Sequence, residues 1–252
     1  AVTWREDGTE PTDAKVPGST SDGTEGATVV YQNGAATVRG AEATVTMAED
    51  RVEKRRLPRA YRHPALDERL RRQRTAREAR LTSESRRAGV PTPLVRDVDT
   101  VETTLTVQRV GDADLREDLA AERVRSVARH LACIHGAGLV HGDPTTRNVR
   151  VRTEEAVEAT DERSGPHSAG PSDGGDTDSE APSVFLIDFG LGYHSQDPED
   201  HAMDLHVLEQ SLTGTSADAE ELRAAVVDTY REAGDSAVLD SLEDIQQRGR
   251  YR

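Results

Sequence analysis

Two short segments of the chain carry acidic and amide side chains at a spacing suited to phosphoryl transfer. The first, His-Gly-Asp-Pro-Thr-Thr-Arg-Asn, runs from His141 to Asn148, and the second, Leu-Ile-Asp-Phe-Gly, runs from Leu186 to Gly190. In this chemistry the protein must place a carboxylate beside the attacking group and hold Mg²⁺ on the phosphates of ATP. The order H-x-D-x(4)-N, then a strand-like run, then D-F-G is typical of phosphotransferases. The sequence therefore predicts an ATP-dependent enzyme that uses Mg²⁺.

The polar residues of these segments divide into one group for the proton and two for the metal. Asp143 is the candidate catalytic base. Asn148, five residues later, and Asp188, after the apolar run 184–187, are the candidate ligands of Mg²⁺. A turn that uses Asp and Asn only for local hydrogen bonds, followed by an unrelated buried strand, is the structural alternative. That alternative leaves the Asp-Phe-Gly segment unexplained.

The composition is strongly acidic and almost free of lysine. The formal net charge is −15, and the only lysines are Lys15 and Lys54. Such a composition resembles that of halophilic archaeal proteins, in which surface carboxylates maintain solubility. Lys54 lies in the expected strand Arg-Val-Glu-Lys-Arg, where a nucleotide-binding lobe needs an ammonium group on the α and β phosphates. A solvated strand lysine is the alternative interpretation.

Composition also limits the cellular location and the kinds of cysteine chemistry. No apolar run approaches the roughly 20 residues that cross a bilayer, and the first residues lack the pattern of a signal peptide. We therefore expect a cytoplasmic protein without membrane partners. Cys133 is the single cysteine, which excludes an intrachain disulfide and a cysteine metal cluster. Its position on an apolar helical stripe predicts a small core residue.

The first half of the chain is expected to form strands around one long helix. Residues 1–27 are rich in Gly, Thr, Asp and Pro and are expected to be a disordered linker. Pro64 can open an arginine-rich helix that runs to about Ala88, where Gly89 and Pro91 stop it. The repeat of this helix is marked by Leu66, Leu70, Arg77 and Leu81. Strands are expected at 28–31, 36–39, 43–47, 51–55 and 105–110.

The long helix also offers a partner for Lys54. Glu78 is the candidate, because an ion pair from this helix fixes the lysine against the phosphates. A helix-surface carboxylate that pairs with neighbouring arginines is the alternative for Glu78.

The second half of the chain is expected to be mainly helical. A helix over 121–137 carries a core-facing stripe. Segments 149–152 and 184–187 are expected to form a hairpin around an acidic surface insertion, residues 153–183. The stripe consists of Val124, Val127, Leu131 and Ile134. Further helices at 203–212 and 220–233 precede a basic tail with Arg248, Arg250 and Arg252.

This order of elements predicts an α+β protein with a two-lobed, protein-kinase-like fold. Residues 28–110 form the expected smaller lobe, with a small antiparallel sheet and the long helix. Residues 111–252 form the expected helical lobe around the catalytic loop.

Over about residues 36–252 the chain resembles the small kinase and ATPase subunit of the KEOPS complex, the PRPK-like family. Besides the two phosphotransferase segments, the order and spacing of several stretches match this family. They are Arg-Gly-Ala-Glu-Ala (39–43), Tyr-Arg-His-Pro-Ala-Leu-Asp-Glu-Arg-Leu (61–70), Arg-Thr-Ala-Arg-Glu-Ala-Arg-Leu (74–81) and Glu-Asp-His-Ala-Met-Asp-Leu-His-Val-Leu-Glu (199–209).

The resemblance implies a role for each candidate site residue. It implies that Lys54 and Glu78 form the nucleotide ion pair, that Asp143 is the base, and that Asn148 and Asp188 hold Mg²⁺. It further implies that Gly40, Ala41 and Glu42 form a turn that covers the phosphates of ATP. It implies that the backbone of Gln108 to Val110 contacts adenine, and that Asp204 supports the catalytic loop from below.

The resemblance also implies partners. The family supports threonylcarbamoylation of the adenosine next to the anticodon of tRNA, together with a transferase subunit and other KEOPS subunits. The first residues, Ala-Val-Thr-Trp-Arg, resemble the end of that transferase, which is fused ahead of the kinase in some archaea. Between Arg51 and Arg87 there are 14 Arg or Lys against 5 Asp or Glu, a local charge of +9. Such a basic stretch is typical of contact with phosphate or an acidic partner, although a solvated helix face is the alternative.

The chain departs from ordinary protein kinases around the catalytic loop. Gly142 replaces the arginine of the usual His-Arg-Asp, no Ala-Pro-Glu follows, and only about a dozen residues separate Gly190 from the helix of Asp204. Little room remains for a peptide platform, which favours an ATPase or a kinase of narrow specificity. A small-molecule phosphotransferase of the aminoglycoside type, a RIO-type kinase and a non-catalytic scaffold are the alternatives. The complete set of candidate site residues argues against the scaffold.

Overall fold

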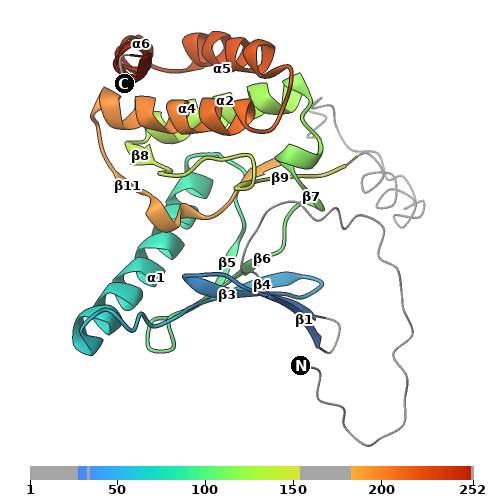
Figure 1. The fold of residues 1–252 in the computed structure, drawn as a ribbon, viewed down its shortest axis with the longest axis vertical. Coiled ribbons are helices and arrows are strands. Elements are labelled where there is room, and N and C mark those ends of the chain that lie inside the picture. Colours follow the sequence, from blue (N-terminus) through green and yellow to red (C-terminus); the bar gives the residue numbers. More distant parts are fainter. Residues whose placement is uncertain (1–27, 33–34, 154–182, 251–252) are drawn as a thin grey trace, which may run out of the picture.

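The protein consists of a smaller lobe built on an antiparallel sheet and a larger lobe built mainly of helices (Figure 1). The computed structural model describes residues 28–32, 35–153 and 183–250. The expected α+β, two-lobed kinase-like fold is thereby confirmed. The expected linker 1–27 and nearly all of the expected acidic insertion lie outside the described residues. Within the described segments, no helix has the length and apolar character needed to cross a bilayer.

Six antiparallel strands form the sheet of the smaller lobe, in the order β1-β2-β3-β4-β6-β5. Side chains alternate between the two faces of a strand, so every second residue of β4 points the same way. Val52, Lys54 and Arg56 are accordingly more buried than Arg51, Glu53 and Arg55 between them. The strands are β1 (Thr28–Gln32), β2 (Ala35–Arg39), β3 (Ala43–Met47), β4 (Arg51–Arg56), β5 (Val95–Asp99) and β6 (Thr104–Gln108).

Helix α1 (Pro64–Arg87) crosses from the smaller lobe to the larger one (Figure 1). Its length was predicted correctly, but its orientation was not. Leu66, assigned to the repeat, is 49% exposed, and Arg77 is also exposed. The face that packs inward combines small and polar residues with few apolar ones, which hides it from a hydrophobic pattern. Its buried members are Asp67, Thr75, Glu78, Ala79, Leu81, Thr82 and Ser85.

The larger lobe has a continuous apolar core between four helices. The expected stripe of α2 (Ala121–Gly136) is confirmed, because all four of its residues are fully buried. Helix α2 packs on α5, and α4 packs on α6. The other helices are α4 (Pro198–Thr213), α5 (Ala219–Ala233) and α6 (Ser236–Arg250).

Two small sheets join this helical core to the cleft between the lobes. One has the order β10-β9-β7 and contains the predicted hairpin, with Phe185 paired to Arg150. The other pairs β11 with β8. Two one-turn helices, η1 (Leu115–Glu117) and η2 (Phe189–Leu191), lie beside them. The strands are β7 (Ala113–Asp114), β8 (Leu139–Val140), β9 (Val149–Val151), β10 (Val184–Leu186) and β11 (Tyr193–His194).

Several sequence predictions were wrong in detail. Cys133 is exposed, because it lies on the edge of α2 with its Sγ 3.0 Å from the carbonyl oxygen of Ala88. Strand β5 was missed, since its alternating Val and charged residues pair only with β6. Helix α6 was also missed, although Val238 and Leu242 on it are buried in the core. It extends through Arg248 and Arg250 of the expected basic tail, while Arg252 lies outside the described residues.

Candidate active site

A cleft between the lobes contains two adjoining cavities, of about 280 Å³ and 600 Å³. The first has mostly apolar walls from both lobes, including Val52, Leu105 and Val110. The second contains the candidate catalytic carboxylates. Both cavities share Val45, Lys54, Asp114 and Asp188. A flat base and a chain of phosphates could occupy these two volumes in succession.

Lys54 connects the two lobes at the junction of the cavities. Its Nζ donates to Oε1 of Glu78 at 2.8 Å and to Oδ1 of Asp188 at 2.7 Å. Burial alone would lower the pKa of Lys54, but the negative charges of Glu78 and Asp188 outweigh it and raise the pKa. The lysine is therefore held in its charged form, as an ammonium group for phosphates must be.

Glu78 is fixed by a second cation that sequence reasoning missed. Its Oε2 accepts from Nη2 of Arg56, and the side chains of both residues are almost fully buried. Arg56 lies two residues after Lys54 on β4 and therefore on the same face of the strand. That spacing was the available signal, although in an arginine-rich segment it did not distinguish Arg56 from its neighbours.

Asp188 follows strand β10 in a left-handed backbone conformation, with φ of 62°. Its Oδ1 accepts from the backbone N–H of Gly190 at 3.2 Å. Burial would raise the pKa of this carboxyl, but the charge of Lys54 and its hydrogen bond lower it below the ordinary value. A side chain at position 190 would collide with this carboxylate, since a Cβ there would lie 2.8 Å from Oδ1. Glycine at position 190 thus leaves room for the Asp188 carboxylate.

The loop between β8 and β9 holds Asp143, which lines the second cavity, against Asn148. Nδ2 of Asn148 donates to the backbone oxygen of Asp143 and to its Oδ2, both at 2.9 Å. Burial raises the pKa of Asp143 above its ordinary value. The contacts of Nδ2 orient the Asn148 amide so that its oxygen remains available to a cation.

His141 fixes the start of this loop from inside the protein. Its Nε2 lies 3.0 Å from the carbonyl oxygen of Ile187, and its Nδ1 accepts from the backbone N–H of Asp143 at 3.3 Å. These contacts assign the proton to Nε2 of a neutral ring. Burial lowers the pKa of His141, which agrees with the neutral form. The imidazole thereby joins the Asp143 loop to the strand that ends at Asp188.

Asp204 of α4 supports the same loop from below, as the family resemblance implied. Its Oδ2 accepts from the backbone N–H of His141 at 2.7 Å, and its Oδ1 from that of Gly142 at 2.8 Å. Two buried residues complete this support and were missed from sequence. Nε2 of His135 lies 3.1 Å from Oδ2 of Asp204, and its Nδ1 lies 2.8 Å from the hydroxyl of Tyr230. The residues come from three helices, so only the tertiary structure unites them.

The expected phosphate-covering turn lies between β2 and β3. The N–H of Gly40 donates to the carbonyl oxygen of Ala43 at 2.9 Å, and Gly40 and Glu42 line the second cavity while Ala41 is exposed. The carboxylate of Glu42 pairs with Arg59 at 3.0 Å and with Arg74 at 3.3 Å. The turn is therefore anchored to α1 through Glu42.

The expected backbone contacts to adenine lie at the end of β6. The N–H groups of Gln108 and Arg109 already donate to the carbonyl oxygens of Leu94 and Asp50. The N–H of Val110 makes no hydrogen bond to the rest of the described chain. Val110 and Gln108 both line the first cavity. Val110 is thus the backbone donor available to a base.

Two oxygen donors suit Mg²⁺, a hard cation that prefers oxygen ligands: one lines the second cavity and the other belongs to the residue bonded to Asp143. The carboxylate of Asp188 and the amide oxygen of Asn148 are such donors, and both belong to segments fixed by backbone hydrogen bonds. A bound Mg²⁺ would supply charge neutralisation at the phosphates.

No family model matches the chain, but named relatives do. A protein of Haloarcula marismortui is 52% identical over 100% of this chain and 39% of its own length. One of Halobacterium salinarum is 56% identical over 87% of the chain and 36% of its own length. Both are named probable bifunctional tRNA threonylcarbamoyladenosine biosynthesis protein, so the chain spans less than two fifths of their length.

A shorter relative decides the family. It is the probable serine/threonine-protein kinase BUD32 homolog of Archaeoglobus fulgidus, 32% identical over 84% of the chain and 94% of its own length. The chain belongs to the BUD32-homologue family of serine/threonine-protein kinases. The recognition based on sequence motifs is thereby confirmed, as is the assignment to enzymes of the atypical protein kinase class.

Solved structures with similar folds were also found. The Rio2 kinase of Chaetomium thermophilum, in an ADP/Mg²⁺-phosphoaspartate complex, has a TM-score of 0.49 and 15% identity, covering 90% of this chain and 71% of that one. WbdD, in a co-crystal structure with a kinase inhibitor, has a TM-score of 0.49 and 15% identity, covering 86% and 52%.

The backbone at Gly142 explains why this loop departs from the usual His-Arg-Asp. Gly142 has φ of 84°, and a Cβ there would lie 2.6 Å from the carbonyl oxygen of Leu191. Only glycine fits this backbone and this close contact. Residues 191–197 then lead directly through β11 to α4. The kinase fold here presents a short segment where a peptide platform would need a longer one.

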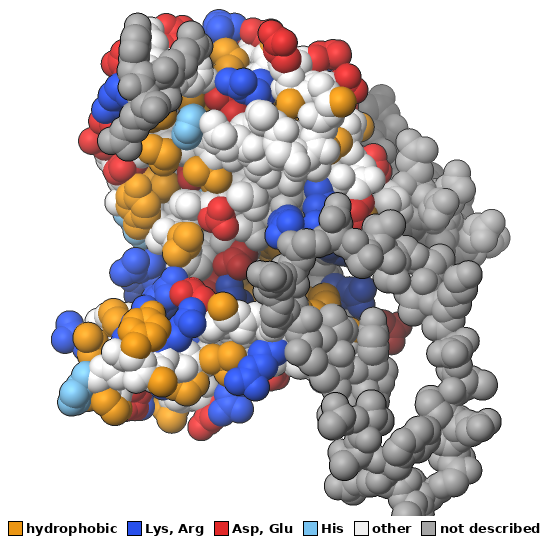
Figure 2. All heavy atoms as spheres, viewed as in Figure 1, with side chains coloured by type: hydrophobic (Ala, Val, Ile, Leu, Met, Phe, Trp, Pro, Cys, Tyr) orange, Lys and Arg blue, Asp and Glu red, His pale blue; other side chains and the backbone are white. Residues whose placement is uncertain are grey.

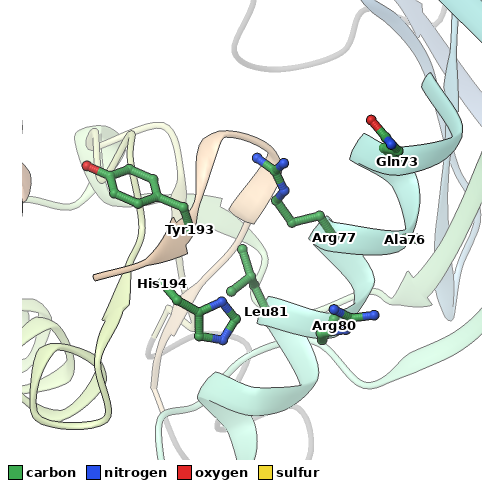
Figure 3. Close-up of a pocket in the computed structure, with 7 residues that line it drawn as sticks. All are labelled: Gln73, Ala76, Arg77, Arg80, Leu81, Tyr193 and His194. Atoms are coloured by element: carbon green, nitrogen blue, oxygen red, sulfur yellow. The ribbon is translucent and has the colours of Figure 1, made fainter. Parts of the chain in front are cut away.

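A separate hollow of about 550 Å³ lies between α1 and β11 (Figure 3). Arg77 and Arg80 line it from the outward face of the helix, and Tyr193 and His194 line it from the strand. Nε2 of His194 lies 2.8 Å from Oε2 of Glu84. Arg77 and Arg80 make no ion pair with any residue in the described part of the chain. The hollow is therefore basic, and it shares no lining residue with the two cavities of the cleft.

Proposed function

We propose that this domain binds Mg²⁺-ATP between its lobes and activates the γ-phosphoryl group for transfer to a hydroxyl or to water. The supporting observation is the position of Lys54, whose ammonium group is bonded to Glu78 and to Asp188 beside the cavity that contains Asp143. These groups have the charges that a nucleotide site requires, a cation for the phosphates and carboxylates for the metal and the proton.

Each group then has one task. Asp143 accepts the proton of the attacking group, and Asn148 and Asp188 hold the Mg²⁺ that neutralises the phosphates. Lys54, positioned by Glu78, binds the α and β phosphates. The turn of Gly40, Ala41 and Glu42 covers the phosphates, while Gln108 and Val110 bind adenine through the backbone. The support for these roles is that all of these residues except Ala41 and Asn148 line one of the two cavities, and that Asn148 is hydrogen-bonded to Asp143.

The range of phosphoryl acceptors is narrow: the acceptor is either water or a residue of the enzyme or its partner. The short segment 191–197 supports this choice, because it leaves little surface on which an extended peptide could lie. ATP hydrolysis is therefore the activity to measure first.

In the cell, we propose that the domain supports threonylcarbamoyladenosine synthesis on tRNA as part of a KEOPS-type complex in the cytoplasm. The names of the longer relatives support this role, because this chain matches one part of those bifunctional proteins. The transferase is then the immediate partner, fused ahead of the kinase. A tether of this kind raises the effective concentration of a partner to about the millimolar range.

The basic surfaces are the proposed contacts for these partners. Basic side chains gather around the smaller lobe and at its boundary with the larger one (Figure 2). We assign the hollow with Arg77 and Arg80 to the transferase and the end of α6 to tRNA. Arg248 already pairs with Glu199 of α4 at 2.8 Å, on an exposed surface where competing phosphates can displace the carboxylate.

The experiment that tests the function is ATP hydrolysis by the purified protein, with and without Mg²⁺, tRNA and the transferase. We expect hydrolysis that depends on Mg²⁺ and increases when tRNA and transferase are added. Absence of ATP binding and of hydrolysis under all these conditions would refute the proposal.

A further inference from the structure

The floor of the first cavity is formed by an arginine rather than by an apolar side chain. On β9, Val149 and Val151 are fully buried in the core of the larger lobe. Because side chains alternate along a strand, Arg150 between them points to the opposite face. Arg150 lines the first cavity together with Leu105, Val107 and Ile187.

Asp114 holds the guanidinium group of Arg150. The two residues are opposite each other in the β7–β9 pair, and Nη1 of Arg150 donates to Oδ1 of Asp114. Each side chain is only 22% exposed. In such a sheltered position, a charge-assisted bond fixes the plane of the guanidinium group better than an exposed pair would.

The backbone fixes this arrangement independently of the ion pair. The N–H of Asp112 donates to the carbonyl oxygen of Val151 at 2.9 Å. Gly111, with φ of 60°, packs so closely that a Cβ there would lie 2.7 Å from the same oxygen. Strand β7 is therefore held against β9 without the side chains. A purely structural role would leave the Arg150–Asp114 pair with little to add.

The position of the pair relative to both cavities indicates what it contacts. Asp114 lines both cavities, so it lies where the base cavity meets the phosphate cavity. Arg150 lines only the cavity of the base. A planar guanidinium group can stack on the face of an aromatic ring, where the attraction is electrostatic as well as dispersive.

We propose that Arg150 is a specificity-determining residue that stacks its guanidinium group on the purine ring of the nucleotide, and that Asp114 positions it. This inference rests on the proposed function, since it concerns the same ATP site. The apolar side chains of the cavity, such as Val45, Val52 and Leu105, contact any base alike. Preference for a purine over a pyrimidine then comes from Arg150, because the larger purine ring offers the larger face for stacking.

The test is direct nucleotide binding by calorimetry, with ATP, GTP and CTP, on the wild-type protein and on Arg150→Leu, Arg150→Lys and Asp114→Asn. For Arg150→Leu we expect the dissociation constants of ATP and GTP to rise about twofold to thirtyfold, the range of a cation–π contact, and that of CTP to rise less. Arg150→Lys keeps the positive charge but lacks the planar guanidinium group, so it should also weaken purine binding. Asp114→Asn should give an intermediate loss.

A matched control is Arg231→Leu, because Arg231 forms an exposed pair with Asp228 far from the cleft, on α5. It should leave all three dissociation constants unchanged. Unchanged or tighter ATP binding in Arg150→Leu would overturn the proposal, as would an equal loss for ATP and CTP. If Arg150→Leu does not fold, Arg150→Lys supplies the same comparison. A wild-type protein that binds no nucleotide would instead refute the proposed function.

Discussion

At the scale of single residues, the charges of the cleft are set by burial and by close partners. Burial raises the pKa of Asp143, while Lys54 keeps the pKa of Asp188 below its ordinary value. Two carboxylates of the same cavity therefore differ in basicity. Such a difference separates a proton acceptor from a permanently ionised metal ligand.

The first prediction concerns these two carboxylates. Asp143→Asn and Asp188→Ala should each reduce ATP turnover by about two to four orders of magnitude, because each removes a charge at the reacting phosphate. Circular dichroism should show an intact fold, since neither residue belongs to the apolar core. Asp228→Asn, on the exposed surface of α5, is the control and should keep full activity. Wild-type turnover in either site variant would contradict the assignment.

A second prediction concerns pH. The base must be ionised to accept a proton, and burial raises the pKa of Asp143 above the ordinary 3.8. As the pH falls, kcat/KM for ATP should therefore decline at a higher pH than an unperturbed aspartate would cause. The measurement is a pH profile of hydrolysis at saturating Mg²⁺, over the range in which the protein stays folded. An acidic limb centred at or below 3.8 would contradict this prediction.

At the scale of elements, α1 connects the groups of the proposed nucleotide site. The helix carries Glu78 to Lys54 and Arg56 of the sheet, and it packs on η2 after Asp188. A shift of α1 would therefore break contacts to both lobes at once. Its buried face is polar because its task is to present Glu78, and its neighbours need only be small enough to fit.

The third prediction tests this buried network through stability. Arg56→Met leaves the buried Oε2 of Glu78 without its cation, which should lower the free energy of unfolding by about 3–5 kcal/mol. The control is Arg55→Met on the same strand, whose pair with Glu102 is exposed and is worth less than about 1 kcal/mol. Urea unfolding of both variants measures the difference. Equal effects of the two substitutions would contradict the buried ion pair.

The fourth prediction concerns the catalytic loop. Gly142→Ala should destabilise the protein by at least about 1 kcal/mol and lower ATP turnover, because its φ of 84° and the carbonyl oxygen of Leu191 exclude a Cβ. Gly136→Ala at the end of α2 is the control, since a Cβ there meets no atom within 4 Å. It should be neutral or stabilising by up to about 1 kcal/mol. Thermal unfolding and hydrolysis assays on both variants decide the matter, and an active, stable Gly142→Ala would refute the argument.

At the scale of the whole molecule, the candidate site residues lie between a sheet lobe and a helical lobe, and the larger lobe contains most of the apolar core. The hairpin of β9 and β10 carries Arg150 and leads to Asp188. Its two strands are closed by the N–H of Arg152, which donates to the carbonyl oxygen of Ser183 at 2.8 Å. The two chain segments that flank residues 154–182 are therefore hydrogen-bonded directly to each other.

The fifth prediction follows from this closure. Replacing residues 154–182 with Asn-Gly should leave the protein folded and its ATP dissociation constant within a few fold, because the resulting three-residue loop of Thr153, Asn and Gly can join the paired Arg152 and Ser183 as a hairpin. Nucleotide calorimetry and thermal unfolding measure the result. Loss of folding in this variant would show that the segment is part of the structure.

The sequence by itself determined the chemistry and the class of fold. The two phosphotransferase segments depend on spacing within a few residues, and the strands and helices near them follow from alternation and helical periodicity, which are local properties. The family and the two-lobed architecture were accessible for the same reason. The roles of the individual site residues remain predictions that the variants above address.

Only the tertiary structure decided which side chains meet across the chain. Arg56 became a partner of Glu78, Arg150 became the floor of a cavity, and Cys133 turned outward through contacts between segments far apart in sequence. The buried face of α1 escaped the hydrophobic pattern because it is mainly polar. Packing and ion pairing between distant segments depend on the whole fold, and no local spacing encodes them.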